Sequence, residues 1–406
     1  MKIIKAKYIL TCNDNFDILE DSAIAFDEHI KQISSFDNLI KIYPDAQIMD
    51  FKDDIAMPAF INPHVHLEFS SNVSSLDYGD FIVWLKSVIK TRDNLSEQAK
   101  NEIIKNAITT MLKSGISTIG EISSFGNEAE ICADCEARFI FFNEILGSNS
   151  ENLSDNWDKF IIKFNNSLKF KSDKFIPAVS IHSPYSTHPK LAKKTLDLAR
   201  QNNLLVSTHF LESKHEKRWL ENGDGEFKVW LGNFSKDVKP FYTPKSFLSY
   251  FEGVRTLFTH CVFADEYLEY FDKNLHCITT CPVSNRLLSN KLNLKKVFDS
   301  KISLNIATDG LSSNISLNFF DELRAALFTH SDFDLLELSK VLLLSSTNAA
   351  AKSLGLELGV IKSGKIADIS IIKGINVNSK DQLALEILLH TKFVKKLYIK
   401  GNECLF

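Results

Sequence analysis

The chain has 406 residues, of which 44% are hydrophobic and 24% are charged, and its formal net charge is −4. This composition is typical of a globular protein with one large domain or two, and it excludes disorder as the main state. Acidic and basic residues are mixed along the chain, so no basic face indicates a nucleic-acid partner.

The cysteines and the N-terminus predict where the protein resides. The seven cysteines are scattered, without the dense spacing of a disulfide framework, which indicates a reducing compartment. The first residues, MKIIKAKYILTCNDNF, lack the small-residue cleavage site of a secretory signal. No segment approaches the roughly 18 apolar residues that a membrane span needs. We therefore expect a cytoplasmic protein with no membrane partner.

Both ends of the chain contain short strand patterns. The first part reads KIIKAKYILT, DSAIAFDEHIKQIS and AQIMDF, and the last part reads IADISIIKG and VKKLYIKGNECLF. Each pattern is too short to bury a core by itself. We expect residues 1–57 and 357–406 to form one small composite β-sandwich.

Between the two ends, residues 58–356 alternate apolar strand-like runs with amphipathic helical stretches, for example at 99–114, 190–202 and 334–345. Near-continuously apolar strands separated by helices are typical of a parallel sheet covered by helices. About eight such units predict an α/β fold with a closed (β/α)8 barrel of the TIM type. An open doubly wound sheet is the alternative, although no G-x-G-x-x-G follows the first strand. The predicted strands are 59–67, 117–123, 137–145, 175–183, 204–212, 256–263, 276–284 and 303–310.

Histidines and carboxylates collect at the carboxyl ends of the predicted strands, where a barrel of this type carries its chemistry. Five of the 11 histidines lie there. In chain order the residues at strand ends are His64 and His66, His182, His209 and Glu212, His260, and Asp309.

Four of these residues predict a metal site. His64 and His66 are one residue apart and so share one face of a strand. A zinc-type ion prefers neutral imidazoles and a carboxylate, which His64, His66, His209 and Asp309 supply. The expected cofactor is one divalent ion, with zinc favoured and iron(II) also compatible with these ligands. A second metal would need a bridging carboxylated lysine at the end of strand four, but Lys174 lies at the opposite end of that strand.

Several motifs, in this order along the chain, resemble the amidohydrolase superfamily and its adenosylhomocysteine deaminase and chlorohydrolase group. They are PAFINPHVHL, IHSPYST, STHFLES, FTHCVF, CPVSNRLL and ATDGLSSNISLNFFDELR. The resemblance implies the β/α barrel and the same four metal ligands. It also implies that Glu212 is the proton shuttle, that His260 steadies the attacking water and that His182 contacts the substrate. Asp309 would serve as both ligand and base.

Two further segments, FFNEILGSNS and DYGDFIVWLKSVI, resemble the aminofutalosine deaminases. That resemblance implies hydrolytic deamination of 6-amino-6-deoxyfutalosine, a purine nucleoside with a carboxybenzoyl chain, in the futalosine route to menaquinone. Asn143 and Glu144 stand where the adenosylhomocysteine enzymes carry an arginine, which disfavours a homocysteine-type substrate. Adenosine, methylthioadenosine and S-adenosylhomocysteine remain alternative substrates, as does a triazine-like ring.

A non-catalytic assembly protein is a more remote alternative, because the metal ligands and Glu212 are all present. The superfamily resemblance is also compatible with a homodimer.

Other residues are candidate substrate contacts, each with a structural alternative. Glu68 could meet a substrate hydroxyl or hold a loop, and Trp84 could stack on an aromatic ring or pack in the core. Arg286 could bind a substrate carboxylate with two hydrogen bonds or hold its own loop. Glu144 is a candidate because of its place at the end of strand three.

Overall fold

A computed structural model describes residues 1–91, 96–233 and 238–406. These residues form two compact units. One consists of Met1–Asn62, Ile108–Ile119 and Leu317–Phe406, and the other of Pro63–Ala107 and Gly120–Ser316. All of the candidate site residues named above belong to the second unit.

Eight strands form the barrel sheet, in the order in which they occur along the chain. The pairs from β8 to β13 are parallel. Strands β7 and β8 are buried at every position, as expected of a parallel sheet with both faces covered. The backbone N–H of Asp309, beyond the last strand, donates to the carbonyl of His64 in the first strand at 3.1 Å. The sheet is therefore nearly closed, and the predicted barrel is confirmed. Its strands are β6 (Phe60–Val65), β7 (Ile116–Ser123), β8 (Arg138–Ile145), β9 (Phe175–Ile181), β10 (Val206–Phe210), β11 (Thr256–His260), β12 (His276–Thr280) and β13 (Ser303–Ile306).

Helices separate these strands, and the three helices predicted from the sequence differ from the observed ones by at most two residues at either end. Helix α6 shows why they form: Pro189 begins it, Asn203 ends it in a left-handed conformation, and its buried residues recur on one face. The helices are α2 (Phe81–Lys90), α3 (Glu97–Lys113), α4 (Ala129–Asp134), α5 (Leu153–Leu168), α6 (Pro189–Asn202), α7 (Lys214–Asn222), α8 (Glu226–Leu231), α9 (Pro244–Ser249), α10 (Pro282–Leu287), α11 (Leu294–Ser300), α12 (Phe319–Thr329), α13 (Leu335–Ser345) and α14 (Asn348–Leu354).

Both chain ends contribute to a second, mixed sheet with the order β16-β15-β14-β5-β1-β2-β3, in which β4 also pairs with β1. Antiparallel pairing of β5 with β14 joins the two ends of the chain. One side buries a core that includes Ile4, Ile24, Phe26, Ile371 and Tyr398. This confirms the predicted composite of both termini. The elements are β1 (Lys2–Leu10), β2 (Ile18–Phe26), β3 (Ile30–Ser35), α1 (Phe36–Ile42), β4 (Gln47–Asp50), β5 (Ile55–Pro58), β14 (Ile369–Ile372), α15 (Leu383–His390), β15 (Lys396–Ile399) and β16 (Asn402–Cys404).

The compact units do not follow the two sheets exactly as expected from the sequence. The unit with the terminal sheet also contains α12, α13, α14 and the first residues of β6 and β7. The boundaries at residues 57 and 357 stay a prediction. Across the described parts of the chain, no helix has both the length and the apolar character to cross a membrane.

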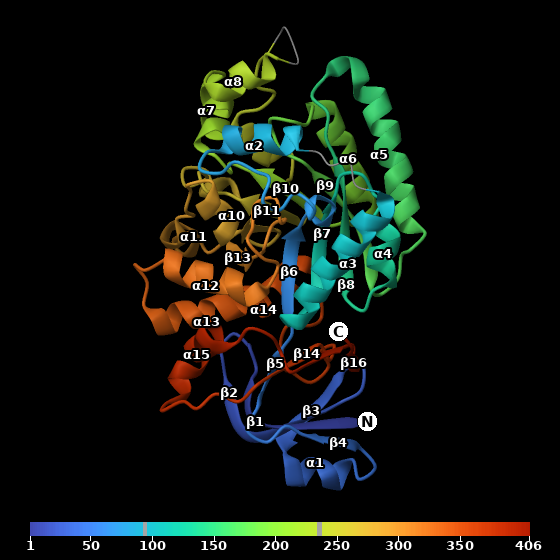
Figure 1. The fold of residues 1–406 in the computed structure, drawn as a ribbon, viewed down its shortest axis with the longest axis vertical. Helices are drawn as coiled ribbons and strands as arrows, with labels where there is room; N and C mark the ends of the chain where they lie inside the picture. The colour runs from blue at the N-terminus through green and yellow to red at the C-terminus, as the bar shows by residue number, and fades with distance from the viewer. Residues whose placement is uncertain (92–95, 234–237) are drawn as a thin grey trace. The chain divides into compact units, whose positions relative to one another are not determined.

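Helices α2, α7 and α8 lie together beyond the carboxyl ends of the barrel strands (Figure 1). Their contacts are aromatic: the rings of Phe81 in α2 and Phe227 in α8 have centroids 5.9 Å apart. These three helices therefore stand at the end of the barrel where the candidate site lies.

Replacement of Gly120 by alanine tests the close packing of the first two barrel strands. A Cβ at Gly120 in β7 would lie 2.1 Å from the carbonyl oxygen of Pro63 in β6, so one strand would have to move. We expect G120A to lower the free energy of unfolding by about 1–3 kcal/mol or more, measured by urea denaturation. Ser117→Ala on the same strand is the control, because within the described structure the buried hydroxyl of Ser117 has no hydrogen-bond partner. Equal stabilities of the two variants would contradict the packing.

Candidate metal centre and active site

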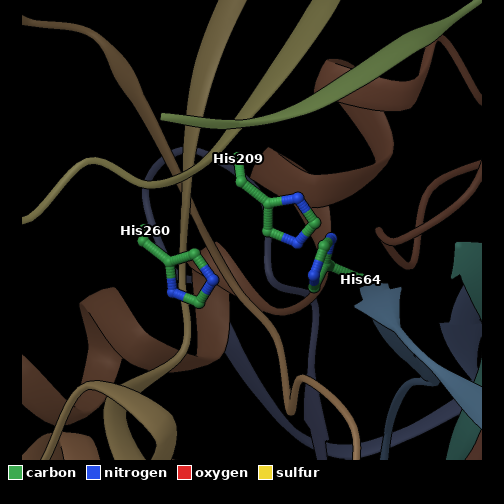
Figure 2. A group of neighbouring side chains, drawn as sticks. All are labelled: His64, His209 and His260. Atoms are coloured by element: carbon green, nitrogen blue, oxygen red, sulfur yellow. The ribbon is translucent and has the colours of Figure 1, made fainter. Parts of the chain in front are cut away.

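The predicted ligands converge at the carboxyl ends of the strands. His64 lies in β6, His66 one residue beyond it, His209 in β10, and His260 at the end of β11. Figure 2 shows the rings of His64, His209 and His260 directed toward one another. Asp309 follows β13 and reaches the same place, so strands far apart in the sequence supply one cluster.

The distances within the cluster are short. The Nε2 atoms of His66 and His209 are 3.2 Å apart. The Oδ1 atom of Asp309 lies 3.8 Å from Nε2 of His64 and 3.8 Å from Nε2 of His66. The potential ligand atoms of His64, His209 and His260 also lie within 4.8 Å of one another. The structure thus brings all four predicted ligands together, with His260 beside them.

Hydrogen bonds from outside the cluster orient the imidazoles. Nδ1 of His209 lies 2.8 Å from the carbonyl oxygen of His182, which can only accept, so Nδ1 carries the hydrogen and Nε2 presents a lone pair. Nδ1 of His64 meets the hydroxyl of Thr259 at 3.2 Å. Among the described residues, the buried Nε2 of His64 has no hydrogen-bond partner. Buried polar atoms are normally paired, and a metal ion would supply the partner here. These residues therefore fit a divalent metal.

Burial keeps the imidazoles of His64 and His209 neutral. Loss of solvent lowers the pKa of His64 and of His209 well below the ordinary value, and neighbouring histidines lower it further. A metal binds the neutral form of histidine, so no proton has to be removed near neutral pH. The electrostatics of the cluster thus favour metal binding.

The carboxylate of Asp309 accepts three hydrogen bonds. Its Oδ2 accepts from the hydroxyls of Ser284 and Ser313, both at 2.8 Å, and its Oδ1 accepts from the N–H of Gly310 at 2.8 Å. The backbone φ angle is +58° at Asp309 and +68° at His260. Such left-handed conformations cost on the order of 1–3 kcal/mol each for residues other than glycine. The surrounding hydrogen bonds hold these side chains in the site against that cost.

Glu212 and His260 form an acid–base pair beside the cluster. Oε1 of Glu212 lies 3.6 Å from Nε2 of His260. Burial raises the pKa of Glu212 well above its ordinary value, with a smaller effect of Asp309 in the same direction, so Glu212 keeps its proton to higher pH. Nδ1 of His260 donates to Oδ1 of Asn285 at 3.1 Å, which leaves Nε2 of the neutral ring free to accept a proton.

A cavity of about 370 Å³ opens above this pair. Its floor is polar and includes His66, His209, Glu212, His260 and Asp309. Its walls are mainly aromatic and aliphatic. They include Phe69, Phe81, Trp84, Leu85, Val88, Tyr185 and Trp230. Cavities of about 300–1,000 Å³ with apolar walls and few polar groups are typical of small-molecule sites.

Three of the candidate substrate contacts line this cavity, namely Trp84, Glu144 and His182. The indole N–H of Trp84 donates to the carbonyl of Ser312 at 2.9 Å. One carboxylate oxygen of Glu144 accepts from the hydroxyl of Ser124 at 2.8 Å. These two side chains are therefore held in place without a ligand.

The other two candidates lie elsewhere. Strand β6 ends before His66 and a 3-10 turn (Leu67–Phe69) follows, so Glu68 does not continue the strand face that was expected from the sequence. Its carboxylate instead accepts the N–H groups of Ser124 and Phe125, which gives it a loop-holding role. Arg286 is exposed on α10 and does not line the cavity, so its contact with the substrate is a prediction without structural support.

The sequence analysis missed the side chains that hold the site. Glu121 accepts the N–H of Leu67 with its two oxygens at 3.1 and 3.2 Å, just beyond His66. Glu216 accepts backbone N–H groups around Glu212. The pattern Ser213-x-x-Glu216, which is typical of a capping box, was the available signal for Glu216.

Known proteins resemble this chain in sequence along its full length. The chain is 41% identical over 407 residues to an aminodeoxyfutalosine deaminase of Nitratiruptor sp., with 99% of both proteins covered. It is 38% identical, with the same coverage, to a Helicobacter pylori protein named adenosine deaminase.

Solved structures agree with this comparison. The crystal structure of Helicobacter pylori aminofutalosine deaminase in complex with methylthio-coformycin matches with a TM-score of 0.94 at 37% identity, and all of both chains are covered. A zinc-bound adenosine deaminase from Xanthomonas campestris, at 19% identity and a TM-score of 0.80, supports the fold alone. Residues 55–404 match the model of the amidohydrolase family, whose members typically depend on divalent metals. The chain belongs to the amidohydrolase family.

Proposed function

We propose that the protein is a metal-dependent deaminase that hydrolyses the adenine amino group of 6-amino-6-deoxyfutalosine and releases ammonia. The observation that carries this proposal is one cavity with an imidazole–carboxylate cluster and a buried glutamate on its floor and aromatic side chains on its walls. The full-length similarity to proteins named as deaminases of this substrate supports it. The product would then feed the futalosine route to menaquinone.

His64, His66, His209 and Asp309 are the proposed metal ligands, and zinc is the proposed ion. Three imidazoles and one carboxylate suit zinc, and they also suit iron(II). The chemistry that such an ion supplies when bound is the activation of water as a nucleophile near neutral pH.

Glu212 and His260 provide the proposed proton transfers. Because Glu212 is buried and keeps its proton, it can deliver that proton to the ring nitrogen beside the attacked carbon, which drains charge from the tetrahedral intermediate. Nε2 of His260 and the carboxylate of Asp309 point to the same space and can accept protons from the attacking water. Glu212, now a carboxylate, can then take a proton from the hydroxyl group at the attacked carbon and pass it to the leaving amine, and the proton taken from the water by Asp309 or His260 returns to Glu212 as ammonia leaves.

The walls of the cavity fit the rest of this substrate. With the purine on the polar floor, a carboxybenzoyl chain would extend along Phe81, Trp84 and Trp230, which offer ring faces and edges to another aromatic group. His182 and Glu144 are proposed contacts for the polar atoms of the nucleoside.

Deamination of adenosine or methylthioadenosine is the alternative, because the same floor serves any adenine nucleoside and one relative is named adenosine deaminase. Ultraviolet spectra of metal-loaded protein with each nucleoside at matched low concentration separate these readings, since conversion of adenine to hypoxanthine changes the absorbance. A preference for 6-amino-6-deoxyfutalosine supports the proposal. Equal or faster turnover of the smaller nucleosides contradicts it. The expected homodimer and cytoplasmic location stay predictions.

Removal of one proposed ligand tests the metal site. We expect H209A to weaken metal binding by at least about 10²-fold, because a first ligand contributes more than the outer-shell groups whose loss costs 10–100-fold. Elemental analysis of purified protein and competition with a chelator measure this. His390→Ala, at an exposed histidine on α15, is the control. Full metal content in H209A would argue against the proposed ligand set.

Replacement of Glu212 by glutamine tests the proton shuttle. The amide has nearly the same shape but cannot transfer a proton, so we expect kcat to fall about 10²–10⁴-fold while metal content is unchanged. Steady-state kinetics and elemental analysis check both expectations. A kcat close to that of the wild type would exclude Glu212 from the chemistry.

Replacement of Trp84 by alanine tests the role of the cavity wall. We expect KM for 6-amino-6-deoxyfutalosine to rise about ten-fold, equivalent to about 1.4 kcal/mol, because an aromatic surface is lost. KM for adenosine should change much less, because adenosine lacks the long chain. Trp157→Ala on α5, outside the cavity lining, is the control. An equal rise in KM for both substrates would show that the carboxybenzoyl chain of the substrate does not contact Trp84.

A further inference from the structure

The segment between β10 and α7 carries Glu212 through an unusual turn. Residues three apart in a strand face opposite sides, so a straight continuation from His209 would direct Glu212 away from the cluster. Strand β10 ends at Phe210, and Leu211 adopts a left-handed conformation with φ at +49°. Leucine rarely adopts this conformation. The position of Glu212 therefore depends on the interactions that stabilise this turn.

One carboxylate holds it. Oε1 of Glu216 accepts the N–H of Leu211 and Oε2 accepts the N–H of Glu212, both at 2.9 Å. The N–H of Glu216 in turn donates to the hydroxyl of Ser213 at 3.1 Å, where α7 begins. Glu216 is fully buried, so water does not compete for these hydrogen bonds. The N–H groups of Leu211 and Glu212, on either side of the Cα atom of Leu211, are thereby both bound to the side chain of Glu216.

An ionised carboxylate makes both bonds most strongly, because it offers two charged acceptor oxygens. The hydroxyl oxygen of a protonated acid is a weaker acceptor, and the amide of glutamine offers one acceptor and presents N–H at the other position. The neighbouring titratable groups that face Glu216 are Glu212, Tyr185 and Cys261. None of these three is a cation, and burial raises the pKa of both Tyr185 and Cys261, so both are neutral near pH 7. The backbone N–H groups are thus the main stabilising partners of the charge.

We infer that Glu216 is a positioning residue for catalysis: by binding the N–H groups of Leu211 and Glu212, it holds the Glu212 carboxyl 3.6 Å from His260. This inference rests on the proposed function, in which Glu212 moves protons. A simple helix cap would contribute to stability alone. A positioning residue also sets the rate, since a displacement of about 1 Å can cost about 10²-fold.

The variant E216Q tests the inference in metal-loaded, full-length protein. We expect kcat for 6-amino-6-deoxyfutalosine, or for the best adenine nucleoside found, to fall about 10²-fold with little change in KM or metal content. Glu221→Gln on the exposed side of the same helix is the matched control and should keep wild-type kcat. The variant E216D, which keeps two acceptor oxygens on a shorter side chain, should recover part of the lost rate.

The pH profile separates positioning from capping. Burial raises the pKa of Glu216 to about 7, so its charged form prevails above that pH and its protonated form below it. In the wild type, protonation of Glu216 weakens one of its two acceptor oxygens, so kcat should decrease as the pH falls through about 7. This part of the decrease should be absent in E216Q, which has no charge to lose.

Several results would overturn the inference. They are an E216Q variant with wild-type kcat and pH profile but a lower Tm, equal loss of rate in E221Q, or failure of both E216Q and E216D to fold with metal bound. Failure of the proposed function looks different, because the wild type itself would then release no ammonia from any adenine nucleoside.

Discussion

The parallel direction of the barrel strands is the constraint on which the site depends. Because the carboxyl ends of parallel strands meet at one rim, residues from β6, β10, β11 and the segment after β13 reach one point although the chain between them is long. The hydrogen bond from the N–H of Asp309 to the carbonyl of His64 closes the rim where first and last strands meet. That bond joins two members of the ligand cluster, so the contact that closes the barrel also brings proposed metal ligands from its first and last strands together.

Burial then decides the protonation of the side chains at the rim. It lowers the pKa of His64, His209 and His260, which keeps the imidazoles neutral, and it raises the pKa of Glu212, which keeps a proton available. The buried environment also has a low polarity, which strengthens the hydrogen bonds around the left-handed residues Leu211, His260 and Asp309. Glu121 binds the N–H of Leu67 just beyond His66, and Glu216 binds the N–H groups of Leu211 and Glu212 just beyond His209. Glu121 and Glu216 thus bind backbone N–H groups, whereas Glu212 is the group proposed to transfer protons.

The sequence predicted the barrel and the convergence of its polar residues well, for a physical reason. Strands buried on both faces read as apolar runs, and a histidine at the end of such a run stands out, as at His64, His209 and His260. Side chains that hydrogen-bond to residues on other elements follow no regular spacing in the sequence, so a sequence pattern does not reveal them. Ser284 binds Asp309 from helix α10 and Ser313 binds it from the loop after β13, and neither contact was predicted. The strand period was extended to Glu68 although β6 ends three residues earlier, at Val65, and Arg286 lies on a helix that turns it to solvent.

In the proposed reaction, the residues on the floor of the cavity direct the addition of water to an adenine ring and the loss of its amine. The most direct measurement is mass spectrometry of the purine product formed by metal-loaded protein in ¹⁸O-labelled water, with ammonia measured in the same sample. The account predicts one ¹⁸O atom in each hypoxanthine product and one ammonia for each turnover. An unlabelled product, or an adenine nucleoside that is bound and returned unchanged without ammonia, would contradict it.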